Sequence, residues 1–102
     1  MRVIAKSALE AFWPTLPKGE QASARAALYS WYEVTRDADW SNYSDIKATF
    51  NTADWIGDAK VVFDVGGNKY RIVCVVGFKS KRLFVIFVGT HKQYDAIDVT
   101  TI

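Results

Sequence analysis

The chain has 102 residues, half of them apolar and four of them tryptophan, which excludes a disordered chain and predicts one domain, residues 1–102, with a single core. Cys74 is the only cysteine, so an internal disulfide is excluded and a reducing cytoplasm is expected. The net charge of +2 is too small to indicate nucleic-acid binding by itself. No apolar run is long enough for a membrane span, and the first residues do not resemble a signal peptide.

The first residues predict a short strand and a short helix. Residues 2–4 are mostly apolar and are expected to form a strand that joins a later sheet. Ser7 and Glu10 have the spacing of a capping box, which places the start of a helix at Ser7. Pro14 removes a backbone donor, so the helix is expected to end near Trp13.

A second helix is predicted over residues 20–35, where apolar residues recur at intervals of three and four. Its Leu28 and Trp31 are expected to pack on the sheet. Residues 36–52 are rich in residues that form turns and caps, and predict an irregular segment with a single helical turn over residues 44–47.

Residues 51–60 predict a polar connection that ends in a turn at Gly57 and Asp58. Most of the four tryptophans are expected in the core. Trp40 and Trp55 are the two that we consider for a binding surface.

Three consecutive antiparallel strands are the most strongly predicted part of the chain. They cover residues 61–65, 69–78 and 82–88, which are dense in β-branched and aromatic residues. The turns between them are Gly66-Gly67-Asn68, which requires positive φ, and Lys79-Ser80-Lys81. Helices grouped ahead of an antiparallel sheet indicate the α+β class.

The basic residues are concentrated on this sheet. Between Lys60 and Lys92 the one acidic residue is Asp64. The basic residues of the same segment are Lys60, Lys69, Arg71, Lys79, Lys81, Arg82, His91 and Lys92. A positive sheet face indicates phosphate binding, and solubilising lysines at hairpin edges are the competing interpretation.

Arg71 requires an explanation because it lies among apolar residues of the middle strand. Alternation places it on the face opposite Tyr70, Ile72 and Cys74. Two interpretations are equally open. Either the aliphatic part of the side chain packs against its neighbours and the guanidinium stays in water, or the guanidinium makes a bidentate pair of hydrogen bonds to a phosphate.

His91 and Tyr94 follow the last strand in the segment after Thr90. If a helical turn begins there, the two side chains share one face. An imidazole can transfer a proton near neutral pH, and a phenol can stack on a base or support a leaving oxygen. A lone histidine is more often an ordinary surface residue, and Tyr94 can also be an aromatic at the edge of the core. One histidine and one cysteine cannot build a zinc site, and no metal or other cofactor is expected.

Two motifs together resemble the HigB family of bacterial toxins, within the RelE-like group of mRNA interferases. They are FDVGGNKYR at residues 63–71 and GTHKQYD at residues 89–95. The resemblance implies a small RelE-like α+β fold with N-terminal helices packed on a curved antiparallel sheet. It also implies the toxin of a type II toxin–antitoxin system, a metal-independent endoribonuclease that cleaves mRNA on the ribosome with the ribose 2′-OH as nucleophile. The implied partners are mRNA, the ribosome and a helix-turn-helix antitoxin similar to HigA.

The resemblance also implies roles for individual residues. Arg71 matches the arginine that holds the scissile phosphate. His91 matches the position of a group that transfers protons or contacts phosphate. Tyr94 matches the tyrosine that stacks on or orients the substrate. Because no glutamate lies on the sheet segment, His91 or a lysine with a lowered pKa is expected to act as the base. The lysines expected to bind RNA are Lys69, Lys92, Lys79 and Lys81.

Two other functions remain open for the same fold. The chain can be a non-catalytic module that binds RNA or a protein through its basic sheet, or a degenerate toxin that retains only its antitoxin contact. Product ends with 5′-hydroxyl and 2′,3′-cyclic phosphate indicate the nuclease, whereas RNA binding without cleavage indicates the module.

Overall fold

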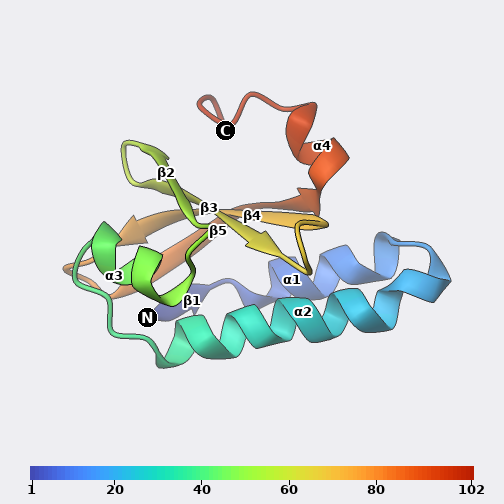
Figure 1. The fold of residues 1–102 in the computed structure, drawn as a ribbon, viewed down its shortest axis with the longest axis horizontal. Coiled ribbons are helices and arrows are strands. Elements are labelled where there is room, and N and C mark those ends of the chain that lie inside the picture. The colour runs from blue at the N-terminus through green and yellow to red at the C-terminus, as the bar shows by residue number, and fades with distance from the viewer.

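A five-stranded sheet runs through the middle of the molecule, and helices α1 and α2 cover one of its faces (Figure 1). The computed structural model describes all 102 residues. The elements are β1 (Arg2–Ile4), α1 (Lys6–Phe12), a short 3₁₀ turn (Trp13–Thr15), α2 (Lys18–Asp37), α3 (Tyr43–Thr49), β2 (Asp54–Gly57), β3 (Lys60–Val65), β4 (Tyr70–Gly77), β5 (Arg82–Thr90) and α4 (His91–Asp95). The predicted α+β class is confirmed.

The strand order in the sheet is β1-β5-β4-β3-β2. The predicted meander of β3, β4 and β5 is confirmed, with each strand antiparallel to the next. The first strand joins the sheet as predicted, but β1 lies parallel to β5, so the sheet is mixed and not wholly antiparallel. A parallel pair requires a long crossover, and here the helices between β1 and β5 form part of it.

The core lies between this sheet and the N-terminal helices. Leu28 and Trp31 of α2 are buried there as predicted, and the ring of Trp31 lies 5.3 Å from the ring of Phe63 on β3. From β4, Ile72 and Cys74 point into the same core, and neither has any exposed surface. Arg71 consequently points to the other face of the sheet.

The predicted helix boundaries need correction. Ser7 does not cap α1, because the helix already begins at Lys6 and the extended residue before it is Ala5. A cap must have non-helical backbone, and Ser7 is helical. The second helix is longer than predicted and runs from Lys18 to Asp37, two residues beyond the predicted limit at each end.

The segment predicted to be irregular contains a regular helix, α3. The side chain of Asn42 accepts a hydrogen bond from the Asp45 backbone N–H (3.0 Å), so Asn42 caps a helix longer than the predicted single turn. Trp40 is buried, with 3% of its surface exposed, and its indole N–H donates to Thr49 (3.0 Å). The proposed surface role of Trp40 is therefore wrong.

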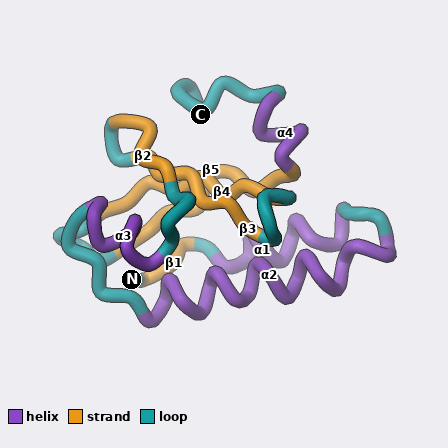
Figure 2. The backbone as a smooth tube through the Cα atoms, in the orientation of Figure 1, coloured by secondary structure: helices purple, strands orange, loops and turns teal.

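The predicted polar connection is also wrong, because it contains the edge strand β2. Asp54 pairs with Val62, Trp55 with Val61 and Gly57 with Lys60, so the hairpin between β2 and β3 turns at Asp58 and Ala59, one residue later than predicted. This hairpin and α4 lie on the side of the sheet away from α1 and α2 (Figures 1 and 2). No helix combines the length and apolar content that a bilayer span requires.

Candidate active site

Arg71 lies in the middle of a short cross-strand row on the face opposite the core. The row consists of Asp64 on β3, Arg71 on β4 and Gly89 on β5. Residues paired across antiparallel strands point to the same face, so this face carries a carboxylate beside the guanidinium. Arg71 is only 8% exposed, so the interpretation with its head in water is wrong.

The guanidinium of Arg71 is held by neighbours on two sides. Its Nε lies 2.9 Å from Oδ1 of Asp64. Nη2 donates to the Asn68 side chain (2.7 Å), and Nη1 donates to the carbonyls of Asn68 (3.1 Å) and Tyr70 (3.3 Å). Each of the three guanidinium nitrogens therefore already has a partner in the protein. Arg71 can offer a phosphate its charge, but not a free bidentate fork.

The turn between β3 and β4 makes this arrangement possible. Gly66, Gly67 and Asn68 all have positive φ, as predicted, with values of 67°, 62° and 76°. Glycine adopts this conformation without steric cost, and asparagine tolerates it better than most residues. The turn brings the side chain and the carbonyl of Asn68 to the same guanidinium, which fixes the orientation of Arg71.

Tyr94 covers Arg71 from α4. Its ring centroid lies 5.9 Å from Cζ of Arg71, which is within the range of a cation–π interaction. The ring also contacts Phe87 of β5, with centroids 6.4 Å apart. Gly89 allows this packing, because a Cβ at that position would lie 2.5 Å from Cζ of Phe87.

Helix α4 is short, and a capping box fixes its start. The Thr90 hydroxyl accepts from the Gln93 N–H (3.1 Å), and the Gln93 side chain accepts from the Thr90 N–H (2.8 Å). The N–H of His91 donates to the carbonyl of Lys69 (2.9 Å), which attaches the start of α4 to the start of β4. The predicted helical turn after Thr90 is confirmed.

The surroundings of Tyr94 raise the pKa of its hydroxyl. Burial raises the pKa of Tyr94 above its ordinary value, and the nearby Arg71 charge opposes this. The carboxylates of Asp54, Asp64 and Asp95 raise the pKa further. The phenol is protonated at neutral pH, as in an ordinary tyrosine.

His91 lies at the same rim, but its imidazole is directed toward the C-terminal end of α4. Nε2 lies 3.4 Å from Oδ2 of Asp95, and about half of the His91 side chain is exposed. The structure thus places Arg71 and Tyr94 in direct contact, with His91 on the same short helix as Tyr94.

The four predicted RNA-binding lysines lie at two ends of the sheet. Lys69 and Lys92 are exposed and belong to the end that carries Arg71 and α4. Lys79 and Lys81 lie in the turn at the far end of β4, roughly 25 Å away for a strand of this length. Lys81 is already paired there with Asp39 (2.8 Å). Only the first two lysines lie at the candidate site.

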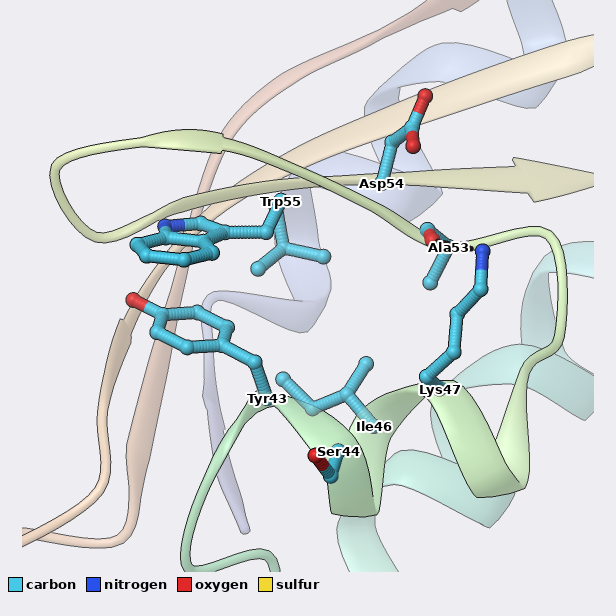
Figure 3. Close-up of a pocket in the computed structure, with 8 residues that line it drawn as sticks. Tyr43, Ser44, Ile46, Lys47, Ala53, Asp54 and Trp55 are labelled. Carbon is cyan, nitrogen blue, oxygen red and sulfur yellow. Dashed lines mark hydrogen bonds between the residues drawn. The ribbon is translucent and has the colours of Figure 1, made fainter.

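Asp54 is a site residue that the sequence analysis missed. It lies on β2 opposite Val62, on the same face as Arg71, and its carboxylate makes no ion pair. In Figure 3 this carboxylate points to the opposite side of β2 from the ring of Trp55. The turn predicted at Gly57 and Asp58, directly before a strongly predicted strand, was the signal that could have identified a preceding strand.

The arrangement suits phosphodiester chemistry in RNA. The Arg71 guanidinium is fixed, and the phenol of Tyr94 lies against it. The imidazole of His91, paired with Asp95, lies on the same helix as Tyr94. No group of three His, Cys, Asp or Glu side chains is placed to hold a metal ion.

Comparison with known proteins identifies the family. The family model described as HigB toxin, the RelE-like toxic component of a toxin–antitoxin system, matches residues 24–97, which include every residue of the candidate site. The mRNA interferase HigB of Escherichia coli O6:H1 (strain CFT073) is 33% identical over 73 residues, which are 70% of this chain and 71% of that protein. The mRNA interferase toxin HigB of Escherichia coli K12 is 42% identical over 52 residues, which are 49% of this chain and 50% of that protein. The chain therefore belongs to the HigB toxin family, the RelE-like toxic component of a toxin–antitoxin system.

Proposed function

We propose that the protein is an endoribonuclease that cleaves mRNA on the translating ribosome in the cytoplasm, and that a helix-turn-helix antitoxin similar to HigA neutralises it. The relatives named as mRNA interferases support this proposal. The observation that carries it is the contact between the Tyr94 ring and the Arg71 guanidinium beside the capped start of α4. A ribosome that holds the message in place would compensate for the few cationic groups of the site.

The proposed reaction needs no metal, because the substrate supplies its own nucleophile. The ribose 2′-OH attacks the adjacent phosphate, and His91 accepts its proton. Arg71 stabilises the charge that develops on the phosphate oxygens, with Lys69 and Lys92 adding positive charge. Tyr94 donates its proton to the departing 5′-oxygen. The products are a 2′,3′-cyclic phosphate and a 5′-hydroxyl, so protons and bonds balance.

One observation favours a second candidate. Asp64 and Asn68 already occupy most of the donors of Arg71, as a structural arginine would require. A non-catalytic RNA- or protein-binding module, or a degenerate toxin, fits this arrangement. Such a protein would retain binding without cleaving RNA.

Cleavage of mRNA on programmed ribosomes distinguishes the two candidates. We expect His91→Ala and Tyr94→Phe to slow cleavage about 10²-fold or more, as for loss of a positioned acid or base. Arg71→Ala is expected to abolish growth arrest, and Arg71→Lys controls for the loss of charge. The matched control is Lys79→Ala, which removes a lysine at the far end of the sheet and is expected to cleave normally. Full growth arrest by folded His91→Ala and Arg71→Ala proteins would exclude the proposed mechanism.

A further inference from the structure

The segment that follows α4, residues 96–102, crosses back over the side of the sheet away from α1 and α2 (Figure 1). We call this segment the C-terminal tail. The family model ends at residue 97, so it does not account for the tail from Asp98 onward. Only Lys60 connects the tail to a strand by hydrogen bonds.

The start of the tail is continuous with the end of α4. The N–H of Ala96 donates to the carbonyl of Gln93, and the N–H of Ile97 donates to the carbonyl of Tyr94 (3.2 Å each). Helix α4 has no buried residue of its own. A displacement of the tail therefore acts directly on the end of α4 that carries Tyr94.

The middle of the tail is a closed turn. Oδ1 of Asp98 accepts from the N–H (3.1 Å) and from the hydroxyl (2.6 Å) of Thr100. The carbonyl of Asp98 accepts from the N–H (3.1 Å) and from the hydroxyl (2.9 Å) of Thr101. These four bonds fix the turn, so that its remaining carbonyls have a defined direction.

Lys60 binds two of these carbonyls from the start of β3. Its Nζ donates to the carbonyls of Val99 (3.3 Å) and Thr100 (3.2 Å) and makes no ion pair. Alternation along β3 places Lys60 on the same face of the sheet as Asp64, the partner of Arg71. A charged donor makes stronger hydrogen bonds than a neutral one, so the ammonium is suited to fasten the tail.

Apolar residues on this face are buried as well. Val62 and Val73 are paired across β3 and β4, and they are 4% and 0% exposed although they lie outside the core under α1 and α2. Their burial requires a cover on this side, where α4, the tail and the β2 hairpin lie (Figure 2). Ile97 and Val99 are the half-buried apolar residues of the tail. The tail thus packs on the sheet in addition to its bonds with Lys60.

We propose that Lys60 is a positioning residue of the candidate active site. Its two hydrogen bonds attach the tail to β3, and the tail fixes the end of α4, so that Tyr94 stays against Arg71. Lys60 lies four residues from Asp64, roughly 13 Å along the strand, so it acts through the tail and not on the scissile phosphate. This inference rests on the proposed function and adds a second attachment of α4 to it.

Two measurements on the full chain test the proposal. One is hydrogen exchange of the Ala96 and Ile97 amides, and the other is cleavage on programmed ribosomes over a range of toxin concentrations. We expect Lys60→Met, which keeps the length of the side chain, to make this exchange about tenfold faster. The maximal cleavage rate should fall about tenfold or more, because Tyr94 is no longer held in place. The toxin concentration for half-maximal cleavage should stay unchanged.

Two further variants control for the loss of a lysine. Lys60→Arg is expected to restore most of the exchange protection and of the cleavage rate, because a guanidinium can donate to both carbonyls. Lys18→Met removes an exposed lysine from α2, on the other side of the sheet, and is expected to behave as the wild type.

A double variant shows whether Lys60 acts through the tail. Asp98→Ala removes the acceptor of both Thr100 bonds and opens the turn, so it should cause the same two defects as Lys60→Met. The combination is expected to be no slower than the slower single variant, because both changes break the same attachment.

Four results would overturn the proposal. A higher concentration for half-maximal cleavage at an unchanged maximal rate would assign Lys60 to phosphate binding. Multiplied losses in the double variant would show that Lys60 does not act through the tail. Unchanged exchange in folded Lys60→Met would show that α4 needs no such attachment, and faster cleavage by Asp98→Ala would show that the tail obstructs the site. If the wild type cleaves no RNA, the proposed function fails, whereas the exchange measurement still decides whether Lys60 fixes the end of α4.

Discussion

The guanidinium of Arg71 is both a structural group and the proposed phosphate ligand. Its ion pair with Asp64 ties β4 to β3, and its bonds to Asn68 tie β4 to the turn between them. The same contacts hold the charge in one place beneath Tyr94. A fixed cation needs no reorganisation when negative charge develops on a phosphate. Loss of Arg71 is therefore expected to lower stability as well as activity, so its variants must be judged against folded controls.

Gly89 permits the packing around this cation. A Cβ there would lie 2.5 Å from the Phe87 ring and 3.0 Å from Oε1 of Gln93. We expect Gly89→Ala to displace Phe87 and to lower the free energy of unfolding by about 1–3 kcal/mol. Urea denaturation measures this change. The matched control is Gly19→Ala, since nothing lies within 4 Å of a Cβ there and alanine favours the helix. If both variants had wild-type stability, the close packing at Gly89 would be contradicted.

Because of Tyr94, the free energy of unfolding is expected to depend on pH in the alkaline range. Burial, together with the carboxylates around the phenol, raises its pKa in the folded protein above that in the unfolded chain. The contribution of the neutral phenol is fully present below the unfolded pKa, about 10, and is lost as the pH rises through the higher folded pKa. We expect the unfolding free energy of the wild type to fall more steeply above about pH 10 than that of Tyr94→Phe. Identical pH profiles would show that Tyr94 is not in this environment.

At the scale of elements, α4 is stabilised by hydrogen bonds at its start and not by its own length. It has five residues, which is too few for a helix to be stable on its own. Its start depends on the reciprocal hydrogen bonds of Thr90 and Gln93 and on the bond from His91 to Lys69. These bonds position both Tyr94 and His91.

Removal of the cap is expected to loosen α4 and to reduce activity. Thr90→Ala removes the acceptor for the Gln93 N–H, at a cost of about 1 kcal/mol. Hydrogen exchange of the α4 amides should become faster, and cleavage should slow because Tyr94 leaves Arg71. Thr90→Ser keeps the hydroxyl and is expected to behave as the wild type. Unchanged exchange and cleavage in Thr90→Ala would show that the cap does not position the site.

The same elements show what the sequence could and could not predict. The meander of β3, β4 and β5 was predictable because its β-branched density and its glycine turn are local signals. Strand β2 was missed because its four residues include Asp54 and an exposed Trp55, and only pairing with β3 makes them a strand. The ion pair of Arg71 with Asp64 could not be predicted either, since it depends on the register that sets Asp64 opposite it.

At the scale of the whole molecule, the two faces of the sheet have different roles. One face packs against α1 and α2 and forms the core. The other face carries Arg71, Asp64 and Asp54, with α4 across one end (Figure 1). Because the site lies on strands that the core holds rigidly, its geometry depends on short elements only at α4 and β2.

The chemistry of the RNA ends produced on programmed ribosomes tests the central claim most directly. We predict a 5′-hydroxyl on one product and a 2′,3′-cyclic phosphate, or the 3′-phosphate derived from it, on the other. We also predict that 2′-deoxyribose at the nucleotide preceding the scissile link prevents cleavage there. Products with 5′-phosphate and 3′-hydroxyl ends, or normal cleavage of the deoxy-substituted message, would contradict the account.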